Sequence, residues 1–408
     1  MELDPSGGGW KSKHGNPGRT SRSCFPGARD GRQFAGVHLG QRCLDVLVDT
    51  AHTVYAVGQS HVALISQTGC VASEFRYHIY GGWPRRIPYS FAGVAMGADG
   101  SIFIAASRWY PAEGFRLAAI DSRGSKLWAY DYPFTGHVGA PVVDAAGNVY
   151  ATHEGRLFCL SPEGVCRWEW GKHPHRYGLP SESLSSPAMD TNGNVYVFQD
   201  YGGRSAICCF SGDGQLTFRV QVREEDYLKV GAVPVVDTAL QRIYCRTARR
   251  GAGRGGVCCI SMLGDVIWRA ELGGDDLDPQ YSDLALGQDG SVLAISDYEG
   301  KPALWRLGVD GDVLWRAQAF MGQGNLARYY SCPTVDADDN VFVGASAGCT
   351  YGLVAFDSFG AVKWGTQFGE IDRKVLDPRA RMIPHQPVIV RPGVLAVSTI
   401  AGYIRLFE

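Results

Sequence analysis

The 408 residues include 39 Lys and Arg against 41 Asp and Glu, so the net charge of −2 gives no overall field that attracts nucleic acid or membrane. Hydrophobic residues make up 45% and charged residues 20%, which indicates a globular chain with a large core. No run of 18 apolar residues is present, so no helical membrane span is expected. The N-terminus lacks an apolar signal segment, and the twelve cysteines are therefore expected as free thiols in the cytoplasm.

A ten-residue phrase recurs along the chain and predicts its architecture. The phrase runs small residue, apolar residue, Asp or Ser, two residues, Gly, three residues, Trp. Its glycines, from Gly69 to Gly360, lie 40 to 55 residues apart, 48.5 on average, which is the period of a four-stranded propeller blade. Copies begin at Leu64, Ala119, Cys159, Cys209, Cys259, Arg306 and Ala355.

Each unit also has an earlier half, such as GAPVVDAAGNVYATHEG from Gly139, that reads as a strand, a turn and a second strand. Helical periodicity is absent, so the sequence predicts an all-β fold: a single-domain, eight-bladed β-propeller of four-stranded antiparallel blades over residues 1–408. The expected blades are 42–77, 89–133, 137–173, 185–224, 230–272, 281–319, 330–368 and 385–408.

The last unit, from His385 to Glu408, supplies three strands and then ends. We expect the N-terminal segment 1–30 to provide the missing outer strand, with Trp10 at its phrase-ending position. A ring closed in this way has no open sheet edge left for aggregation.

Large aromatic residues end most copies of the phrase, and we expect them to fill the wedges between neighbouring blades. Repetition around the ring favours this packing role over ligand stacking. The expected blade-docking residues are Trp10, Trp128, Trp168, Phe218, Trp268, Trp315 and Trp364.

These phrases resemble the tryptophan-docking repeats of the pyrroloquinoline-quinone-like (PQQ-like) β-propellers. The opening GWKSKHGNPGRTSRS, with its Trp, Gly-Asn, Arg-Thr and Ser, is similar to the start of such domains. The family includes quinoprotein dehydrogenases and cofactor-free interaction modules. The turns here, such as Ser-Arg-Gly and Pro-Glu-Gly, are one residue shorter than the Thr-Gly-Lys turns of the dehydrogenases, so the resemblance implies a cofactor-free member.

Two adjacent cysteine pairs, Cys208–Cys209 and Cys258–Cys259, invite comparison with the vicinal disulfide that packs on the quinone in the dehydrogenases. However, Cys209 and Cys259 occupy the repeat position that holds Ala119 and Ala355 elsewhere. Successive side chains of a strand point to opposite faces, so we expect buried free thiols that serve as small hydrophobic residues.

Other candidate chemistry is weaker. The acidic groups Asp275–Asp278, Glu224–Asp226 and Asp336–Asp339 lack a calcium-loop spacing, and GAGRGG from Gly251 lacks the Lys and helix of a phosphate loop. The pair His173 and His175 has no further zinc ligand that the sequence can place. No catalytic residue, cofactor or metal ligand is expected, and the balance favours a protein that is not an enzyme.

Long segments between the second and third strands of a blade, and between blades, are expected on one face and are rich in Arg and aromatic residues, Arg246 among them. We therefore expect a scaffold or binding subunit of a multiprotein assembly that recognises a protein partner there. The alternatives are a small ligand or quinone in the central funnel, and nucleic acid held by the basic loops. The expected contact residues are Trp83, Arg85, Arg86, Arg249, Arg250, Arg254, Tyr281, Arg328, Tyr330, Arg379 and Arg381.

Overall fold

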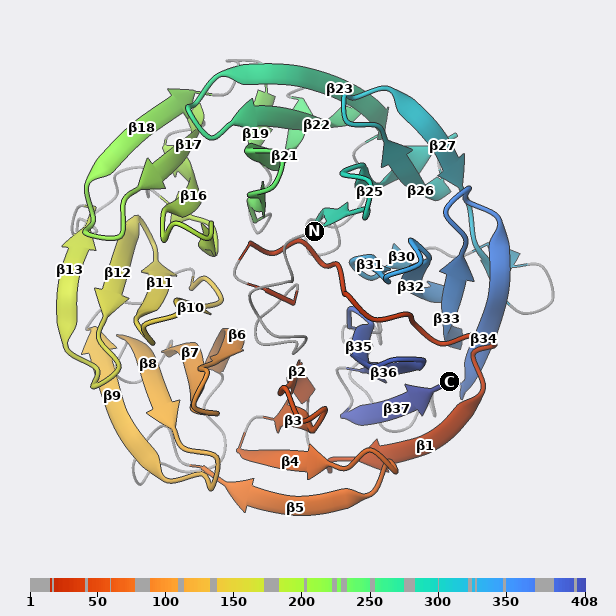
Figure 1. Ribbon diagram of the computed structural model, residues 1–408, viewed down its shortest axis with the longest axis horizontal. Helices are drawn as coiled ribbons and strands as arrows, with labels where there is room; N and C mark the ends of the chain where they lie inside the picture. Colours follow the sequence, from red (N-terminus) through yellow and green to blue (C-terminus); the bar gives the residue numbers. More distant parts are fainter. Residues whose placement is uncertain are drawn as a thin grey trace.

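In the part of the chain that the structure describes, all the elements are β-strands, arranged as eight sheets around a central axis (Figure 1). Each sheet is an antiparallel meander of four strands, so the predicted eight-bladed β-propeller is confirmed. No helix among these residues is long and apolar enough to cross a bilayer. The computed structural model describes residues 15–16, 18–40, 43–58, 60–77, 89–108, 114–132, 138–171, 183–201, 204–221, 226–228, 233–249, 254–274, 283–299, 301–321, 325–326, 329–347, 350–370, 385–399 and 402–408.

The first four blades follow one another along the chain, each running from the axis to the rim. In blade 4 the innermost strand is interrupted, so that β14 and β15 both pair with β16. The strands are β2 (Cys43–Val48), β3 (Val54–Gly58), β4 (His61–Ile65) and β5 (Val71–Arg76) in blade 1; β6 (Tyr89–Met96), β7 (Ile102–Arg108), β8 (Gly114–Ile120) and β9 (Lys126–Tyr132) in blade 2; β10 (Val142–Val143), β11 (Val149–His153), β12 (Arg156–Leu160) and β13 (Cys166–Trp170) in blade 3; and β14 (Ser183–Leu184), β15 (Ala188–Met189), β16 (Val195–Tyr201), β17 (Arg204–Phe210) and β18 (Leu216–Gln221) in blade 4.

Blades 5 to 7 repeat this plan, and the innermost strand is interrupted again in blades 5 and 7. A small two-stranded sheet, β28 (Phe320–Met321) with β29 (Asn325–Leu326), lies in the connection from blade 6 to blade 7. The strands are β19 (Asp226–Leu228), β20 (Val235–Asp237), β21 (Arg242–Arg249), β22 (Arg254–Ser261) and β23 (Val266–Gly274) in blade 5; β24 (Ala285–Leu286), β25 (Val292–Tyr298), β26 (Lys301–Leu307) and β27 (Val313–Ala317) in blade 6; and β30 (Tyr329–Tyr330), β31 (Thr334–Val335), β32 (Val341–Ala347), β33 (Thr350–Phe356) and β34 (Val362–Glu370) in blade 7.

Burial along the strands follows from the packing of blade against blade. All five residues of β12 are buried, because a middle strand is covered on both faces by neighbouring blades. In the outer strand β13 the residues alternate between half-buried and exposed, because its edge faces solvent. The inner strands therefore read as continuous apolar runs, while the rim strands alternate.

One contact joins blade to blade at the rim. The ring of Trp128 lies over Gly164 in the turn of the next blade, where an added Cβ would come within 2.5 Å of the indole. Trp128 Nε1 donates to the Pro162 carbonyl at 2.7 Å, also in that turn. The same indole-to-carbonyl bond joins Trp268 to Val309 at 2.7 Å. Trp168, Trp315 and Trp364 lie in the same way over Gly214, Gly360 and Gly31.

Blade 8 combines both ends of the described chain. Its strands are β35 (Val388–Arg391), β36 (Val394–Ser398), β37 (Tyr403–Phe407) and, at the rim, β1 (Gln33–His38). Closure of the ring by an N-terminal strand is thus confirmed, but the strand begins at Gln33 and lies beyond the predicted segment 1–30. Ala35 takes the phrase-ending position, four residues after Gly31, and contacts Gly69 of blade 1. Trp10, which was expected there, lies outside the described residues.

Candidate functional site

The two ends of the strands define two faces. The turn face carries the turns between the first and second and between the third and fourth strands of each blade, and the loop face carries the other connections. Arg249 and Arg254 end and begin the paired strands β21 and β22 at the loop face, and Tyr330 lies in β30. The other expected contact residues lie outside the described residues: Trp83, Arg85, Arg86, Arg250, Tyr281, Arg328, Arg379 and Arg381.

Arg246 does not lie on the surface as expected. Its side chain is buried between blades 5 and 6, where Nη1 donates to the Gly256 carbonyl and Nη2 to the Ile295 carbonyl, each at 3.1 Å. The guanidinium donates hydrogen bonds to these two carbonyl oxygens in the wedge between the blades, because a buried cation needs hydrogen-bond acceptors. Its role is therefore structural.

The N-terminal segment 18–28, here called the hub segment, runs from the axis across the inner strands toward the rim (Figure 1). The amides of Val236, Leu286 and Val335 donate to the carbonyls of Gly18, Thr20 and Ser21 at 2.8 to 2.9 Å. Further on, Gly393 of blade 8 donates its amide to the Pro26 carbonyl at 2.9 Å. One short stretch therefore contacts blades 5, 6, 7 and 8 in turn.

Arg19 extends the hub segment to blades 3 and 4. Its side chain is fully buried, and Nη2 donates to the Ala140 carbonyl at 2.7 Å while Nε donates to the Pro187 carbonyl at 2.8 Å. Burial lowers the pKa of Arg19 to about 10, and the nearby carboxylates of Asp283 and Asp45 oppose that shift. The guanidinium is thus charged at neutral pH and fills the centre of the ring.

The innermost strands surround Arg19 with a ring of eight residues at equivalent register, one from each blade. Polar contacts run between neighbours: the Ala140 amide donates to Ser186 Oγ at 2.8 Å, and Gln386 Nε2 donates to the Pro333 carbonyl at 2.9 Å. Except for two aspartates, the residue type differs from blade to blade, so the ring carries no repeated motif. Its members are Asp45, Gly93, Ala140, Ser186, Val233, Asp283, Cys332 and Gln386.

The cysteine pairs occupy the wedges between blades. Cys208 packs with residues of blade 3 and Cys209 with residues of blade 5, so the two side chains point to opposite faces of their sheet, as predicted. Cys258 and Cys259 are divided in the same way. Burial raises the pKa of Cys209 to about 11 and that of Cys259 to about 12. These thiols are protonated at neutral pH and lack the thiolate that nucleophilic or redox chemistry needs.

Among the described residues, no group of three or more His, Cys, Asp or Glu is arranged to hold a metal ion. Asp336, in the first turn of blade 7, accepts the Asn340 amide at 2.8 Å and the Gly27 amide at 2.8 Å. Its carboxylate therefore orders the turn and holds the hub segment. His173 and His175 lie outside the described residues.

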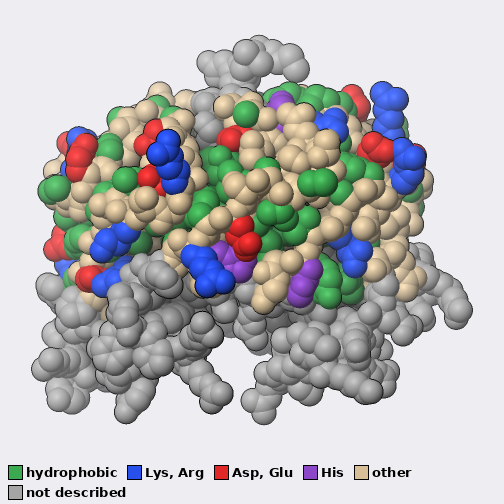
Figure 2. All heavy atoms as spheres, turned by 90° about the horizontal axis from the view of Figure 1, so that it is seen from below, with side chains coloured by type: hydrophobic (Ala, Val, Ile, Leu, Met, Phe, Trp, Pro, Cys, Tyr) green, Lys and Arg blue, Asp and Glu red, His purple; other side chains and the backbone are tan. Residues whose placement is uncertain are grey.

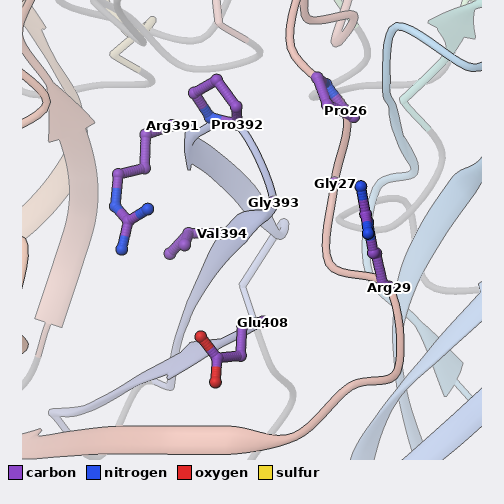
Figure 3. Close-up of a pocket in the computed structure, with 8 residues that line it drawn as sticks. All are labelled: Pro26, Gly27, Arg29, Arg391, Pro392, Gly393, Val394 and Glu408. Atoms are coloured by element: carbon purple, nitrogen blue, oxygen red, sulfur yellow. The ribbon is translucent and has the colours of Figure 1, made fainter.

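A pocket of about 290 Å³ opens where the hub segment passes the first turn of blade 8 (Figure 3). Arg391 and Glu408 line one side, and Pro26, Gly27 and Arg29 line the other. Arg29 is exposed, and Glu408 is held by an ion pair with Arg32. The pocket is an open hollow between the two ends of the described chain, with two cationic side chains and one carboxylate. It lacks the convergent set of polar groups that a ligand site needs.

The rim carries charges of both signs. Figure 2 views the edge of the propeller and shows basic and acidic side chains interspersed along it. Arg116, for example, donates from Nη2 to Asp131 Oδ2 at 2.6 Å across the outer strands of blade 2. The described part of the edge seen in Figure 2 is therefore not the uniformly basic surface that nucleic acid would require.

Comparison with solved structures supports the fold. The chain is similar to the Dos1 propeller, with 11% identity, a TM-score of 0.54 and coverage of 98% of this chain and 95% of the other. It is also similar to the dihydro-heme d1 dehydrogenase NirN, with 13% identity, a TM-score of 0.55 and coverage of 89% and 73%. Porphyromonas gingivalis dipeptidyl peptidase 4 gives 12% identity and a TM-score of 0.53 over 93% of this chain and 60% of that one.

No known family profile and no curated protein sequence matches the chain. At these identities the structural similarity shows a β-propeller fold and nothing about the activity. The PQQ-like assignment stays a prediction.

Sequence reasoning missed the hub segment and Arg19. Arg19 and the first part of the hub segment lie inside the opening stretch GNPGRTSRS, which was noted only for its resemblance to a domain start. A usable signal was present: Asp30 and Gly31 precede Ala35 as Asp310 and Gly311 precede Trp315. Aligning Gly31 and Ala35 with Gly311 and Trp315 identifies Gln33–His38 as the outer strand. The residues before Arg29 are then not needed for that strand and can cross the ring.

Proposed function

We propose that the protein is a non-enzymatic binding scaffold that recognises a protein partner through its loop face. The observation that carries this proposal is the filled hub. Arg19 and the hub segment occupy the centre of the ring from the turn face and contact six of the eight blades, from blade 3 to blade 8. A ring tied together at its centre is a rigid support, and recognition is usually carried by loops held on such a support.

The chemistry of the described residues agrees with this role. The cysteines of the wedges are protonated and buried, and Asp336 is engaged in its turn. Arg249 and Arg254 end and begin two paired strands at the loop face. Arginine is enriched among the residues that dominate the energy of protein interfaces.

The test compares a charge reversal on the loop face with one away from it. Arg249→Glu with Arg250→Glu alters the loop face, and Arg123→Glu with Arg167→Glu makes the same charge change at exposed sites of blades 2 and 3. The tagged proteins are purified with their bound partners, which are quantified by mass spectrometry. We expect the amount of at least one co-purified partner to fall at least tenfold in the first variant and to be retained in the second. Equal retention by both variants would contradict the loop-face assignment.

A small ligand in the central funnel remains the alternative function. It predicts an absorbing chromophore in the purified protein, or saturable calorimetric binding of a quinone with calcium. Either result would overturn the non-enzymatic proposal.

A further inference from the structure

The turn face carries an apolar surface that the scaffold role does not explain. The residue before the turn glycine of each blade is polar or charged in six blades, as in Arg123, Glu163 and Asp310. In blades 5 and 7 it is Leu263 and Phe359, which are 85% and 82% exposed. Such turn tips have no need of large apolar side chains for folding, because they touch no core.

The exposed apolar residues are concentrated in one sector. Among the described residues fourteen large hydrophobic side chains are exposed, and nine of them belong to blades 5, 6 and 7. Four lie in turns: Leu240, Leu263, Val309 and Phe359. The other five lie on the outer strands β23, β27 and β34. Clustering of this kind marks an interaction surface, whereas scattered single residues do not.

Contacts between the blades hold these turns together. Trp268 Nε1 donates to the Val309 carbonyl at 2.7 Å, and Trp315 Nε1 donates to the Ser358 carbonyl, beside Phe359, at 2.8 Å. Leu240 and Val309 both approach Gly290, with their nearest methyl carbons 2.5 and 3.4 Å from the place of an added Cβ. The four turn residues, here called the apolar turn patch, therefore sit on a rigid base that needs no ordering when a partner binds.

The charge around the apolar turn patch is mostly negative. Its six turns contain the exposed aspartates Asp265, Asp289, Asp310, Asp312 and Asp338. The cations that reach these turns come from neighbouring strands and are engaged there: Arg306 pairs with Asp289 and Asp339, and Lys363 donates to Asn340 Oδ1. Arg242 donates to the Val309 carbonyl, so its guanidinium is engaged within the turns. A partner must therefore offer apolar side chains for Leu263 and Phe359 and cationic side chains for the aspartates.

We propose that the apolar turn patch of blades 5 to 7 is a docking surface for a basic amphipathic segment of a protein partner. Such a segment places leucine-like residues on one side and Lys or Arg beside them, which matches the patch and its aspartates. A second copy that presented the same face would set the aspartates of the two copies against each other. An anionic membrane surface would be repelled for the same reason.

The binding test uses a fluorescein-labelled, helical Lys–Leu amphipathic peptide and a Glu–Leu peptide of equal length, followed by fluorescence anisotropy. We expect saturable binding of the Lys–Leu peptide only. Leu263→Ser with Phe359→Ser should weaken it at least tenfold. Asp310→Asn with Asp312→Asn should weaken it about threefold to tenfold and flatten its salt dependence. All four side chains are exposed, so the melting temperature serves as a folding check and should hold.

Val165→Ser with Leu216→Ser is the matched control, because it removes two exposed apolar residues from blades 3 and 4. It should leave the affinity within twofold. An equal loss of affinity in this control, or equal binding of the Glu–Leu peptide, would overturn the proposal. The same holds if the unaltered protein does not bind the Lys–Leu peptide at 100 µM, roughly the range of weak interfaces. Self-association in sedimentation that Leu263→Ser with Phe359→Ser abolishes would assign the surface to a second copy instead. Arg249→Glu with Arg250→Glu should not change peptide binding, which separates this surface from the loop face.

Discussion

The rim and the hub of this propeller hold the same eight blades together by opposite means. At the rim one contact recurs: an aromatic ring over a turn glycine, as with Trp128 on Gly164 and Trp315 on Gly360. At the hub the blades present seven different residue types, and Arg19 joins two of the blades through hydrogen bonds to the Ala140 and Pro187 carbonyls. The wedges between blades have the same shape, so one residue type can fill many of them. The axis occurs only once, so the residues there do not repeat.

The largest expected effect comes from the hub. Arg19→Met removes a fully buried cation that bonds two blades and faces Asp45 and Asp283, so carbonyls and carboxylates lose their compensating charge. We expect a loss of about 3–5 kcal/mol in the free energy of unfolding, measured by urea denaturation. Arg29→Met, an exposed site of the same N-terminal stretch, should change it by less than about 0.5 kcal/mol. Similar small changes in both variants would mean that the hub does not hold the ring.

A rim contact should cost less, because the aromatic contacts between the other blades remain. Gly164→Ala and Gly193→Ala are a matched pair: both glycines have positive φ, +82° and +84°. An added Cβ meets the Trp128 ring at 2.5 Å in the first case and nothing within 4 Å in the second. We expect Gly193→Ala to cost about 1–2 kcal/mol from the left-handed backbone and Gly164→Ala about 1–3 kcal/mol more. If both variants lose the same free energy of unfolding in urea denaturation, the stability of the ring does not depend on the close contact between Trp128 and Gly164.

The smallest effect concerns the thiols and leaves stability unchanged. Cys24 and Cys70 are exposed, whereas Cys43 at the inner strand and Cys209 in a wedge are buried. Burial raises the pKa of Cys43 and of Cys209, to about 12 and about 11, so at pH 8 both stay protonated. Iodoacetamide at pH 8, followed by mass spectrometry, should label Cys24 and Cys70 at least 100-fold faster than the other two. Rapid labelling of Cys209 but not Cys43 would show that the wedges open while the hub stays closed.

The sequence predicted the rim because the rim repeats. Spaced glycines and tryptophans identified the blades, and the shared position of Cys209, Cys259 and Ala119 placed the cysteines in the wedges. The contacts of the hub could not be predicted, since Arg19 occurs once and Asp45 and Asp283 look like ordinary strand residues. Ala35 was not predicted for a related reason: it places a methyl group at the repeat position where most blades have an aromatic ring. The Arg-rich loops were predicted as a group, but most of their residues lie outside the described part.

The split construction of blade 8 has a consequence for the order of assembly. Gln33 pairs with Phe407, and Glu408 exchanges backbone hydrogen bonds with Arg32, so β1 cannot pair until residues 403–408 have been synthesised. Blades 1 to 7 emerge from the ribosome earlier, while β1 still lacks its partner strand. Contacts of such sequence separation slow folding and leave the ring transiently open. The pairing of Arg32 with Glu408 therefore forms late, and it is the step that closes the ring.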